Sequence, residues 1–222
     1  MKMSTTRNIL YTHDMYIRTI VPECLISHFN LDFNIVEIDE AKEKYVKDFP
    51  VKTTPAVKLK DGSKFFEQLA VNEYLIRSTG NNVEIKQLLG SSDDLIHQAN
   101  INCIASFSGS DVLNVLAGYV KPYIGMLPYD NTLEQKYLEK LSIFYKIFEE
   151  KLATQKYLTG DEITIADLIT ATSLKLGFAF IFGKEWRNEH KSITEWFENV
   201  IHSKYLESHF KDFRYPEVPA TL

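Results

Sequence analysis

A proline placed directly before an alternating strand constrains this chain more than any other feature. Pro55 precedes alternating apolar and polar residues over 56–60, and Asp61-Gly62 follows them. Proline lacks a backbone N–H, so it is tolerated at the first residue of a strand and rarely inside one. Glycine accepts the positive φ of a tight hairpin turn. We therefore expect a strand that begins at Pro55, a cis Thr54–Pro55 amide and a hairpin at 61–62.

The segments around this hairpin predict a βαβ unit followed by a ββα unit. The predicted elements are a strand over 8–12, a helix over 19–29, a strand over 33–38, a charged and exposed helix over 40–49, the hairpin strands, and a helix over 67–78. A helical crossover joins parallel strands, whereas a tight hairpin joins antiparallel ones, so the sheet should be mixed. This order, with a proline before the third strand, resembles the thioredoxin fold.

The second half of the chain has helical periodicity throughout. Ile96, Ala99, Cys103 and Phe107 are spaced three or four residues apart, and this spacing predicts one buried helical face. A second helix repeats the pattern at Leu138, Leu141, Tyr145, Phe148 and Leu152. We therefore predict a thioredoxin-like domain over 1–80, a linker over 81–92 and an all-helical domain over 93–222.

Thr164 and Asp167 form the clearest local signal of this half. A threonine followed three residues later by an acidic residue, ahead of an apolar run, is typical of a capping box that starts a helix. Its role should be structural, because the first amides of a helix need hydrogen-bond partners wherever the helix begins.

Composition excludes several classes of protein. The 222 residues include 25 basic and 30 acidic ones, which are dispersed, so direct nucleic-acid binding is not expected. No run of eighteen apolar residues and no apolar signal core occur, so we expect a cytoplasmic protein that crosses no membrane. Cys24 and Cys103 stand far apart, and His13 and His28 have no spacing partner. We expect two reduced, packed thiols and no metal site.

Taken together, these features resemble the glutathione transferase family, and most closely the N-terminal transferase-like domain of the translation elongation factor 1 gamma subunits. The resemblance to the latter rests on residues 16–22, 49–52, 89–90, 93–95, 128–129, 157–159, 163–168 and 182–187, with His190 and residues 196–197. The segment Gly183-Lys184-Glu185-Trp186-Arg187 discriminates best, since other transferases usually lack it. Lys191 and Glu195 depart from the gamma pattern, and the further C-terminal domain of a full gamma subunit is not expected here.

This resemblance implies a glutathione site in the first domain. Thr54, before the cis proline Pro55, would pair its main chain with the cysteinyl part of glutathione. Glu67 and Gln68 stand where the family has a Glu-Ser pair that holds the γ-glutamyl carboxylate. Arg18 and Lys52 are further candidate partners for the carboxylates of glutathione, although both could equally be solvated surface cations.

A transferase must also stabilise the glutathione thiolate. Lowering a thiol pKa by about two units requires roughly 2.7 kcal/mol, part of which a hydroxyl donor can supply. The resemblance implies that Tyr16 falls near the position at which some glutathione transferase classes have a catalytic serine. Tyr11 lies in the strand where other transferase classes have a catalytic tyrosine. Tyr16 is the better candidate, because it follows the turn and an aromatic residue in a short strand is usually core.

Two functions remain open at this point. The first is a glutathione-binding or protein-interaction module linked to translation elongation, with elongation factor 1 subunits as partners. The alternative is a catalytically active glutathione transferase that conjugates glutathione to electrophiles. A thiol-disulfide oxidoreductase is disfavoured, because Cys24 lies well inside its helix rather than at an N-terminus. The resemblance also implies a homodimer.

Overall fold

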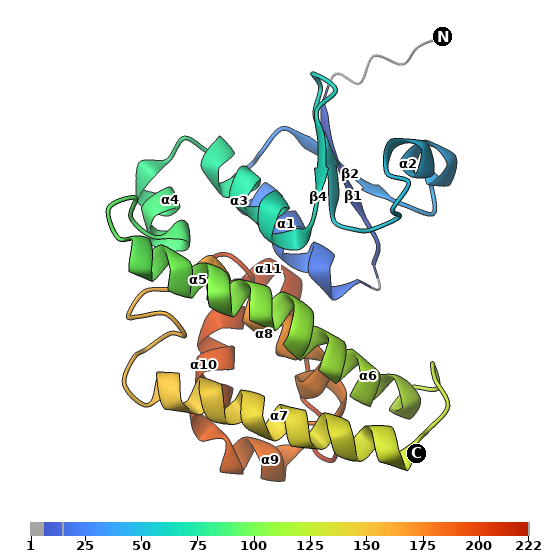
Figure 1. The fold of residues 1–222 in the computed structure, drawn as a ribbon, viewed down its shortest axis with the longest axis vertical. Coiled ribbons are helices and arrows are strands. Elements are labelled where there is room, and N and C mark those ends of the chain that lie inside the picture. The colour runs from blue at the N-terminus through green and yellow to red at the C-terminus, as the bar shows by residue number, and fades with distance from the viewer. Residues whose placement is uncertain (1–6, 15, 222) are drawn as a thin grey trace. The chain divides into compact units, whose positions relative to one another are not determined.

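The computed structural model describes residues 7–14 and 16–221 (Figure 1). Its contacts divide the chain into two compact units, residues 1–86 and 87–222. The division lies within the predicted linker 81–92, and most of that segment forms helix α4 (Asn82–Leu89), whose last two residues, Leu88 and Leu89, are buried. The connecting segment is therefore an ordered helix rather than an open loop.

The first unit contains a four-stranded mixed sheet, as the sequence predicts. Its elements are β1 (Asn8–Thr12), α1 (Ile17–His28), β2 (Phe33–Glu37), α2 (Lys42–Asp48), β3 (Ala56–Lys58), β4 (Lys64–Phe66) and α3 (Gln68–Ser78). The strand order is β2-β1-β3-β4; β1 pairs with β2 in parallel, and β3 is antiparallel to both β1 and β4. The Thr54–Pro55 amide is cis and β3 begins immediately after it, which confirms the central expectation from the sequence.

Helices cover both faces of this sheet. In Figure 1, α2 lies on one face, while α1 and α3 lie on the other. The α2 face has its own apolar cluster of Ile9, Tyr11, Tyr45, Phe49 and Ala56. The expectation that segment 40–49 is an exposed helix was therefore wrong in part: its lysines and glutamates face solvent, but Tyr45 and Phe49 are buried against β1 and β3.

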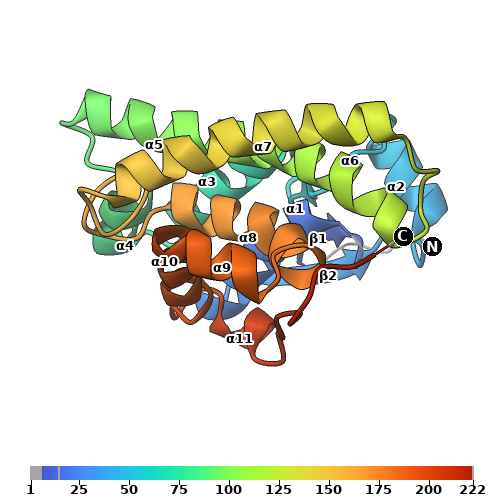
Figure 2. The ribbon, with the colours of Figure 1, turned by 90° about the horizontal axis from the view of Figure 1, so that it is seen from below.

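The second unit is helical, as predicted. Its elements after α4 are α5 (Leu95–Phe107), a π-helical turn η1 (Ser108–Val112), α6 (Leu113–Tyr123), α7 (Asn131–Leu152), α8 (Ile165–Phe180), α9 (Lys184–Glu189), α10 (Lys191–Ile201) and α11 (Glu207–Phe210). Helix α8 is the centre: it is buried along most of its length and contacts α5, α6 and α10. Figure 2 shows α5 and α6 as one continuous rod, with α7 running alongside it.

Helix α5 buries a different face from the one that its spacing suggests. Ile101, Ile104 and Ala105 are buried, whereas Ile96 is 78% exposed and Cys103 also lies on the surface. The expectation of a packed Cys103 was therefore wrong, and that of a packed Cys24 is confirmed. Apolar residues with helical spacing occur on both sides of α5, so the pattern predicts a helix without choosing its buried face.

The Thr164–Asp167 capping box is present and extends further than the sequence shows. The Asp167 carboxylate accepts from the Thr164 amide at 2.9 Å and from the Thr164 hydroxyl at 3.0 Å. Its other oxygen accepts from the Leu158 amide and the Trp196 indole N–H, both at 2.9 Å. Burial raises the pKa of Asp167, although all these hydrogen bonds oppose that shift. One buried carboxylate thus joins the start of α8 to the preceding loop and to α10.

One continuous helical stretch, Leu95–Tyr123, is long and apolar enough to cross a membrane by length and composition. The core helices of folded domains pass the same test. Here one side of the stretch packs against α7 and α8, and Ser108 in its π-helical turn is buried and accepts a hydrogen bond from Thr170 of α8. The apolar composition of the stretch 95–123 is therefore explained by its packing in the core of the helical unit.

Candidate functional site

Strand register gathers the predicted glutathione residues at one end of the sheet. Ala56 pairs with Tyr11 on one side and with Phe66 on the other. Thr54 and Pro55 therefore enter the sheet where β1 ends and where β4 leads into α3. The turn containing Tyr16 and the first residues of α3 lie at this same end, so the fold places these segments as a single site would require.

Thr54 and Gln68 carry the least satisfied polar atoms of this group. Gln68 is the first residue of α3 and is only 7% exposed, and Thr54 is 6% exposed. Within the described chain, neither Thr54 Oγ1 nor Gln68 Nε2 has a hydrogen-bond partner. Buried polar atoms normally find partners, and an unpaired one costs about 1–3 kcal/mol, so these two atoms are candidates for contact with a polar ligand or water.

Three charged candidates lie in neighbouring segments. Glu67 is exposed, caps α3 with its backbone and adopts φ = 80°, which is unusual for a residue other than glycine. Lys52 is exposed with φ = 58°, two residues before Thr54. Arg18 is the second residue of α1 and is half-buried. The structure thus offers two cations and one carboxylate in segments that flank the proline turn or begin α1.

The two tyrosine candidates lie in opposite environments. Tyr16 caps α1 with its backbone, is 46% exposed, and stacks on the ring of His13 with centroids 4.4 Å apart. Tyr11 is fully buried against Tyr45 and Phe49. Burial, together with the nearby Asp48 carboxylate, raises the pKa of Tyr11 to about 12. A thiol could reach Tyr16 from solvent, whereas the Tyr11 hydroxyl is enclosed by core side chains.

Sequence reasoning missed three features near this end of the sheet. The Tyr45 hydroxyl donates to the Thr53 carbonyl at 2.8 Å and so supports the turn before Pro55. Asn72, four residues after Gln68 on α3, is fully buried, and neither of its side-chain polar atoms has a partner among the described residues. His13, expected to be an ordinary polar residue, lies beside Glu37 and Asp39. Sequence spacing predicts only that Gln68 and Asn72, four residues apart on α3, share one face of that helix. It gives no sign of the other contacts.

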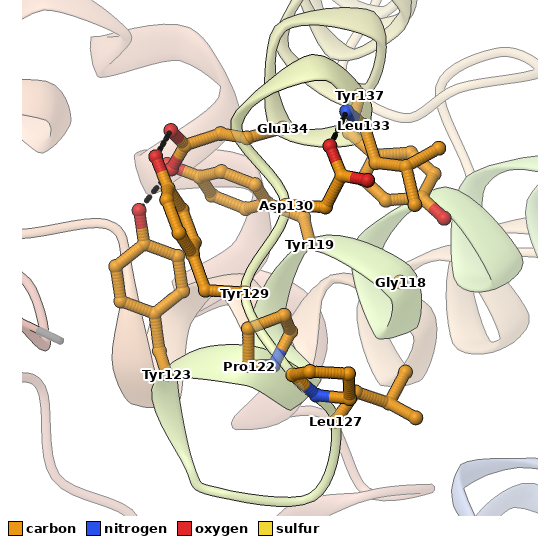
Figure 3. A pocket seen from close by; sticks show the side chains of 11 residues that line it. Gly118, Tyr119, Pro122, Tyr123, Leu127, Tyr129, Asp130, Leu133, Glu134 and Tyr137 are labelled. Atoms are coloured by element: carbon orange, nitrogen blue, oxygen red, sulfur yellow. Dashed lines mark hydrogen bonds between the residues drawn. The ribbon is translucent and has the colours of Figure 1, made fainter.

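The helical unit contains a small aromatic pocket where α6 leads into α7 (Figure 3). The Glu134 carboxylate accepts hydrogen bonds from the Tyr123 hydroxyl and, at 2.8 Å, from the Tyr129 hydroxyl. Burial and Glu134 raise the pKa of Tyr123. The cavity holds only about 50 Å³, and its polar groups largely satisfy one another. This arrangement fixes the turn between two helices.

The Gly183–Arg187 segment anchors the C-terminal residues to the end of α8. The Arg187 guanidinium donates to the carbonyls of Phe182 at 2.6 Å and Pro216 at 2.8 Å, and it lies over the ring of Tyr215. Gly183 is close-packed, because a Cβ there would come within 2.8 Å of Pro219. A groove of about 750 Å³ lies beside this anchor and is lined in part by Tyr145 and Trp186.

We predict that Arg187→Ala loosens the C-terminal segment. The change removes two charge-assisted hydrogen bonds and the contact with Tyr215, which leaves residues after Arg214 less protected. Limited trypsin digestion, followed by intact-mass analysis, should show cleavage after Arg214 at least about tenfold faster than in the parent. Lys191→Ala, an exposed cation on α10, is the control and should leave the rate unchanged. An unchanged rate in Arg187→Ala would contradict the anchoring role.

Comparison with known proteins agrees with the two-unit architecture. Residues 7–77 match the family described as "Glutathione S-transferase, N-terminal domain", and residues 114–204 match "Glutathione S-transferase, C-terminal domain". The first match covers most of the sheet-containing unit, and the second covers most of the helical unit. The chain belongs to the glutathione transferase family.

Within this family, the chain is similar to elongation factor 1-gamma proteins of Saccharomyces cerevisiae. It is 35% identical to "Elongation factor 1-gamma 1" over 91% of this chain and 49% of that protein. It is 34% identical to "Putative elongation factor 1 gamma homolog" over 89% of both. The crystal structure of the GST-like domain of elongation factor 1-gamma matches with a TM-score of 0.88 and 34% identity, over 97% of this chain and 98% of that one. The chain thus spans about half of the first of these relatives.

Proposed function

We propose that this chain is a glutathione-binding, protein-interaction module linked to translation elongation, with elongation factor 1 subunits as partners. The observation that carries the glutathione part is the pair of buried, unpartnered atoms Thr54 Oγ1 and Gln68 Nε2 at one end of the sheet. The similarity to elongation factor 1-gamma proteins supports the interaction part. A cytoplasmic location agrees with both parts and stays a prediction.

The proposed site binds glutathione through complementary polar groups. The Thr54 main chain pairs with the cysteinyl amide, and the amides at the start of α3, together with Gln68 Nε2, donate to the γ-glutamyl carboxylate. Arg18 and Lys52 would attract the carboxylates electrostatically. Glutamine is longer than the serine that the family usually has, so its donor is less rigidly held. We therefore expect affinity weaker than that of a dedicated transferase.

Glutathione should raise the melting temperature of the parent protein, and Gln68→Ala should reduce this shift strongly. The substitution removes a buried amide donor that has no partner among the described residues, so we expect binding about tenfold weaker, measured by calorimetric titration with reduced glutathione. Gln135→Ala, an exposed glutamine on α7, is the matched control and should bind like the parent. Absence of any glutathione-dependent shift in the parent would refute the binding proposal.

The alternative, an active glutathione transferase, requires a hydroxyl that faces the bound sulfur. Tyr16 is the candidate, because its side chain reaches solvent next to the turn, while burial argues against use of Tyr11. Turnover of a chromogenic electrophile with glutathione, lost in Tyr16→Phe, would favour the enzyme. Glutathione binding without turnover, together with co-elution of purified elongation factor 1 subunits, would favour the interaction module.

We also propose a homodimer that uses the exposed apolar side of α5. Leu95 is 74% exposed, and Ile96, Ala99 and Cys103 continue the same surface. Exposed apolar surface of this kind is typical of contact sites. Sedimentation velocity should show a dimer in the parent and a shift to monomer in Ile96→Glu. Ile143→Glu, an exposed position on α7, is the control. A monomeric parent at tens of micromolar would exclude the dimer.

A further inference from the structure

The ends of the parallel strands β1 and β2 bring three metal-ligating side chains together. Thr12, the last residue of β1, pairs with Glu37, the last residue of β2. His13 follows Thr12 directly, and Asp39 lies two residues beyond Glu37. Parallel strands that end in register place the residues after them at one edge of the sheet. The topology thus brings an imidazole together with two carboxylates that lie more than twenty residues further along the chain.

The geometry of this group is close to that of a metal-binding site. One ligand atom from each of His13, Glu37 and Asp39 lies within 4.8 Å of the others. His13 Nδ1 is 3.8 Å from Glu37 Oε1, and His13 Nε2 is 3.8 Å from Asp39 Oδ2. The ligands of a tetrahedral zinc ion, bound at about 2.0–2.1 Å, lie roughly 3.4 Å apart. A single ion binds only one of the two ring nitrogens, so one carboxylate oxygen would shift by about 0.4 Å and the other by up to about 1.4 Å to complete the site.

A backbone hydrogen bond already holds the Glu37 carboxylate in one orientation. Its Oε2 atom accepts a hydrogen bond from the Asp14 amide at 3.1 Å. Its Oε1 atom is shielded from solvent and has no hydrogen-bond partner within the described residues. The hydrogen bond to Oε2 fixes the orientation of the Glu37 carboxylate and leaves Oε1 available for coordination. Asp39 supplies the adjustable ligand, because its side chain is 72% exposed.

The charge around the group also favours a cation. Two carboxylates and a neutral imidazole balance a divalent ion. Glu23 also lies nearby: burial is the main cause that raises its pKa, and the Asp14 and Glu37 carboxylates raise it further. Several acidic groups that repel one another are stabilised when a cation neutralises them.

We propose that His13, Glu37 and Asp39 bind a first-row transition-metal dication, for which Zn²⁺ is the probe. A nitrogen donor with two carboxylate oxygens suits Zn²⁺ and Co²⁺, whereas Mg²⁺ and Ca²⁺ prefer oxygen alone. The fourth position remains open to water. Because Tyr16 stacks on the His13 ring and its amide donates to the His13 carbonyl at 2.8 Å, the ion would also fix Tyr16.

Calorimetric titration of Zn²⁺ into untagged protein, freed of metal by chelation and dialysis, tests this proposal. We expect one ion per chain in the parent, binding at least about tenfold weaker in Asp39→Asn, and no site-specific binding in His13→Ala. His28→Ala, on the same unit, and Asp93→Asn, an exposed aspartate elsewhere, are the matched controls and should bind like the parent. Co²⁺ should give visible absorption of a tetrahedral site in the parent and lose it in His13→Ala.

Two outcomes would overturn the proposal. One is the absence of stoichiometric binding in the parent. The other is binding that is equally tight in the parent, His13→Ala and Asp39→Asn, as for dispersed surface carboxylates. Asp39 is exposed, so Asp39→Asn should fold normally, and a loss of binding there cannot be attributed to unfolding. Neither readout uses glutathione, so the proposal stands or falls separately from the proposed function.

Discussion

Replacing Asp167 by alanine should destabilise the helical unit by about 4 kcal/mol. The substitution removes the acceptor for four hydrogen bonds and leaves the Leu158 amide, the Thr164 amide and hydroxyl and the Trp196 indole N–H without their partner. All these groups lie in a buried region, where each unpaired donor costs about 1–3 kcal/mol, and relaxation recovers part of the sum. An exposed N-cap substitution would cost only about 1 kcal/mol.

Urea denaturation followed by tryptophan fluorescence measures this effect. Both tryptophans of the chain, Trp186 and Trp196, lie in the helical unit, so their emission reports the unfolding of that unit alone. Asp161→Ala is the matched control, since Asp161 is an exposed carboxylate in the same loop. A loss of less than about 1.5 kcal/mol in Asp167→Ala would mean that Asp167 acts as an ordinary surface cap.

Gly177→Ala should destabilise the helical unit by about 3 kcal/mol, although alanine is the better helix former. In an open helix position, replacing glycine by alanine gains roughly 0.5–1 kcal/mol. A Cβ on Gly177 would lie 2.2 Å from the Phe182 ring, which is fully buried and stacks on Trp186 with centroids 3.8 Å apart. The added methyl group would force this buried, stacked ring to shift, so overpacking decides the sign.

Gly118→Ala provides the comparison for this prediction. A Cβ on Gly118 would come within 2.5 Å of the Tyr137 side chain, but Tyr137 is only half-buried, and its ring can turn toward solvent. We expect a change of less than about 1 kcal/mol in either direction, measured by the same urea denaturation. Equal losses for the two variants would show that the enclosure of Phe182 is not the cause.

Local sequence signals predicted most of this fold correctly. Pro55, the Asp61-Gly62 turn and the Thr164–Asp167 cap each depend on backbone chemistry within a few residues, and the structure confirms all three. The mixed sheet followed from connection rules. The predicted buried face of α5 was wrong. Ile96 and Cys103 are seven residues apart and Ile101 and Ala105 are four apart, both of which are helical spacings, so only tertiary packing distinguishes the two sets.

The candidate site was less predictable. The resemblance named Thr54, Gln68 and Tyr16, and the structure shows their surroundings: two unpartnered buried atoms and one exposed tyrosine. The group formed by His13, Glu37 and Asp39 had no signal in spacing. Its members meet because two parallel strands end in register, which is a property of the sheet and not of either segment.

The hydrogen bonds of Asp167 also determine how the helical unit should open. Leu158, Thr164 and Trp196 share one acceptor group, so none can lose its bond for long unless the carboxylate moves. Hydrogen–deuterium exchange at the two amides and at the indole should therefore proceed through a common opening event with a similar protection factor. The loop before α8 and the middle of α10 would then behave as a single cooperative element.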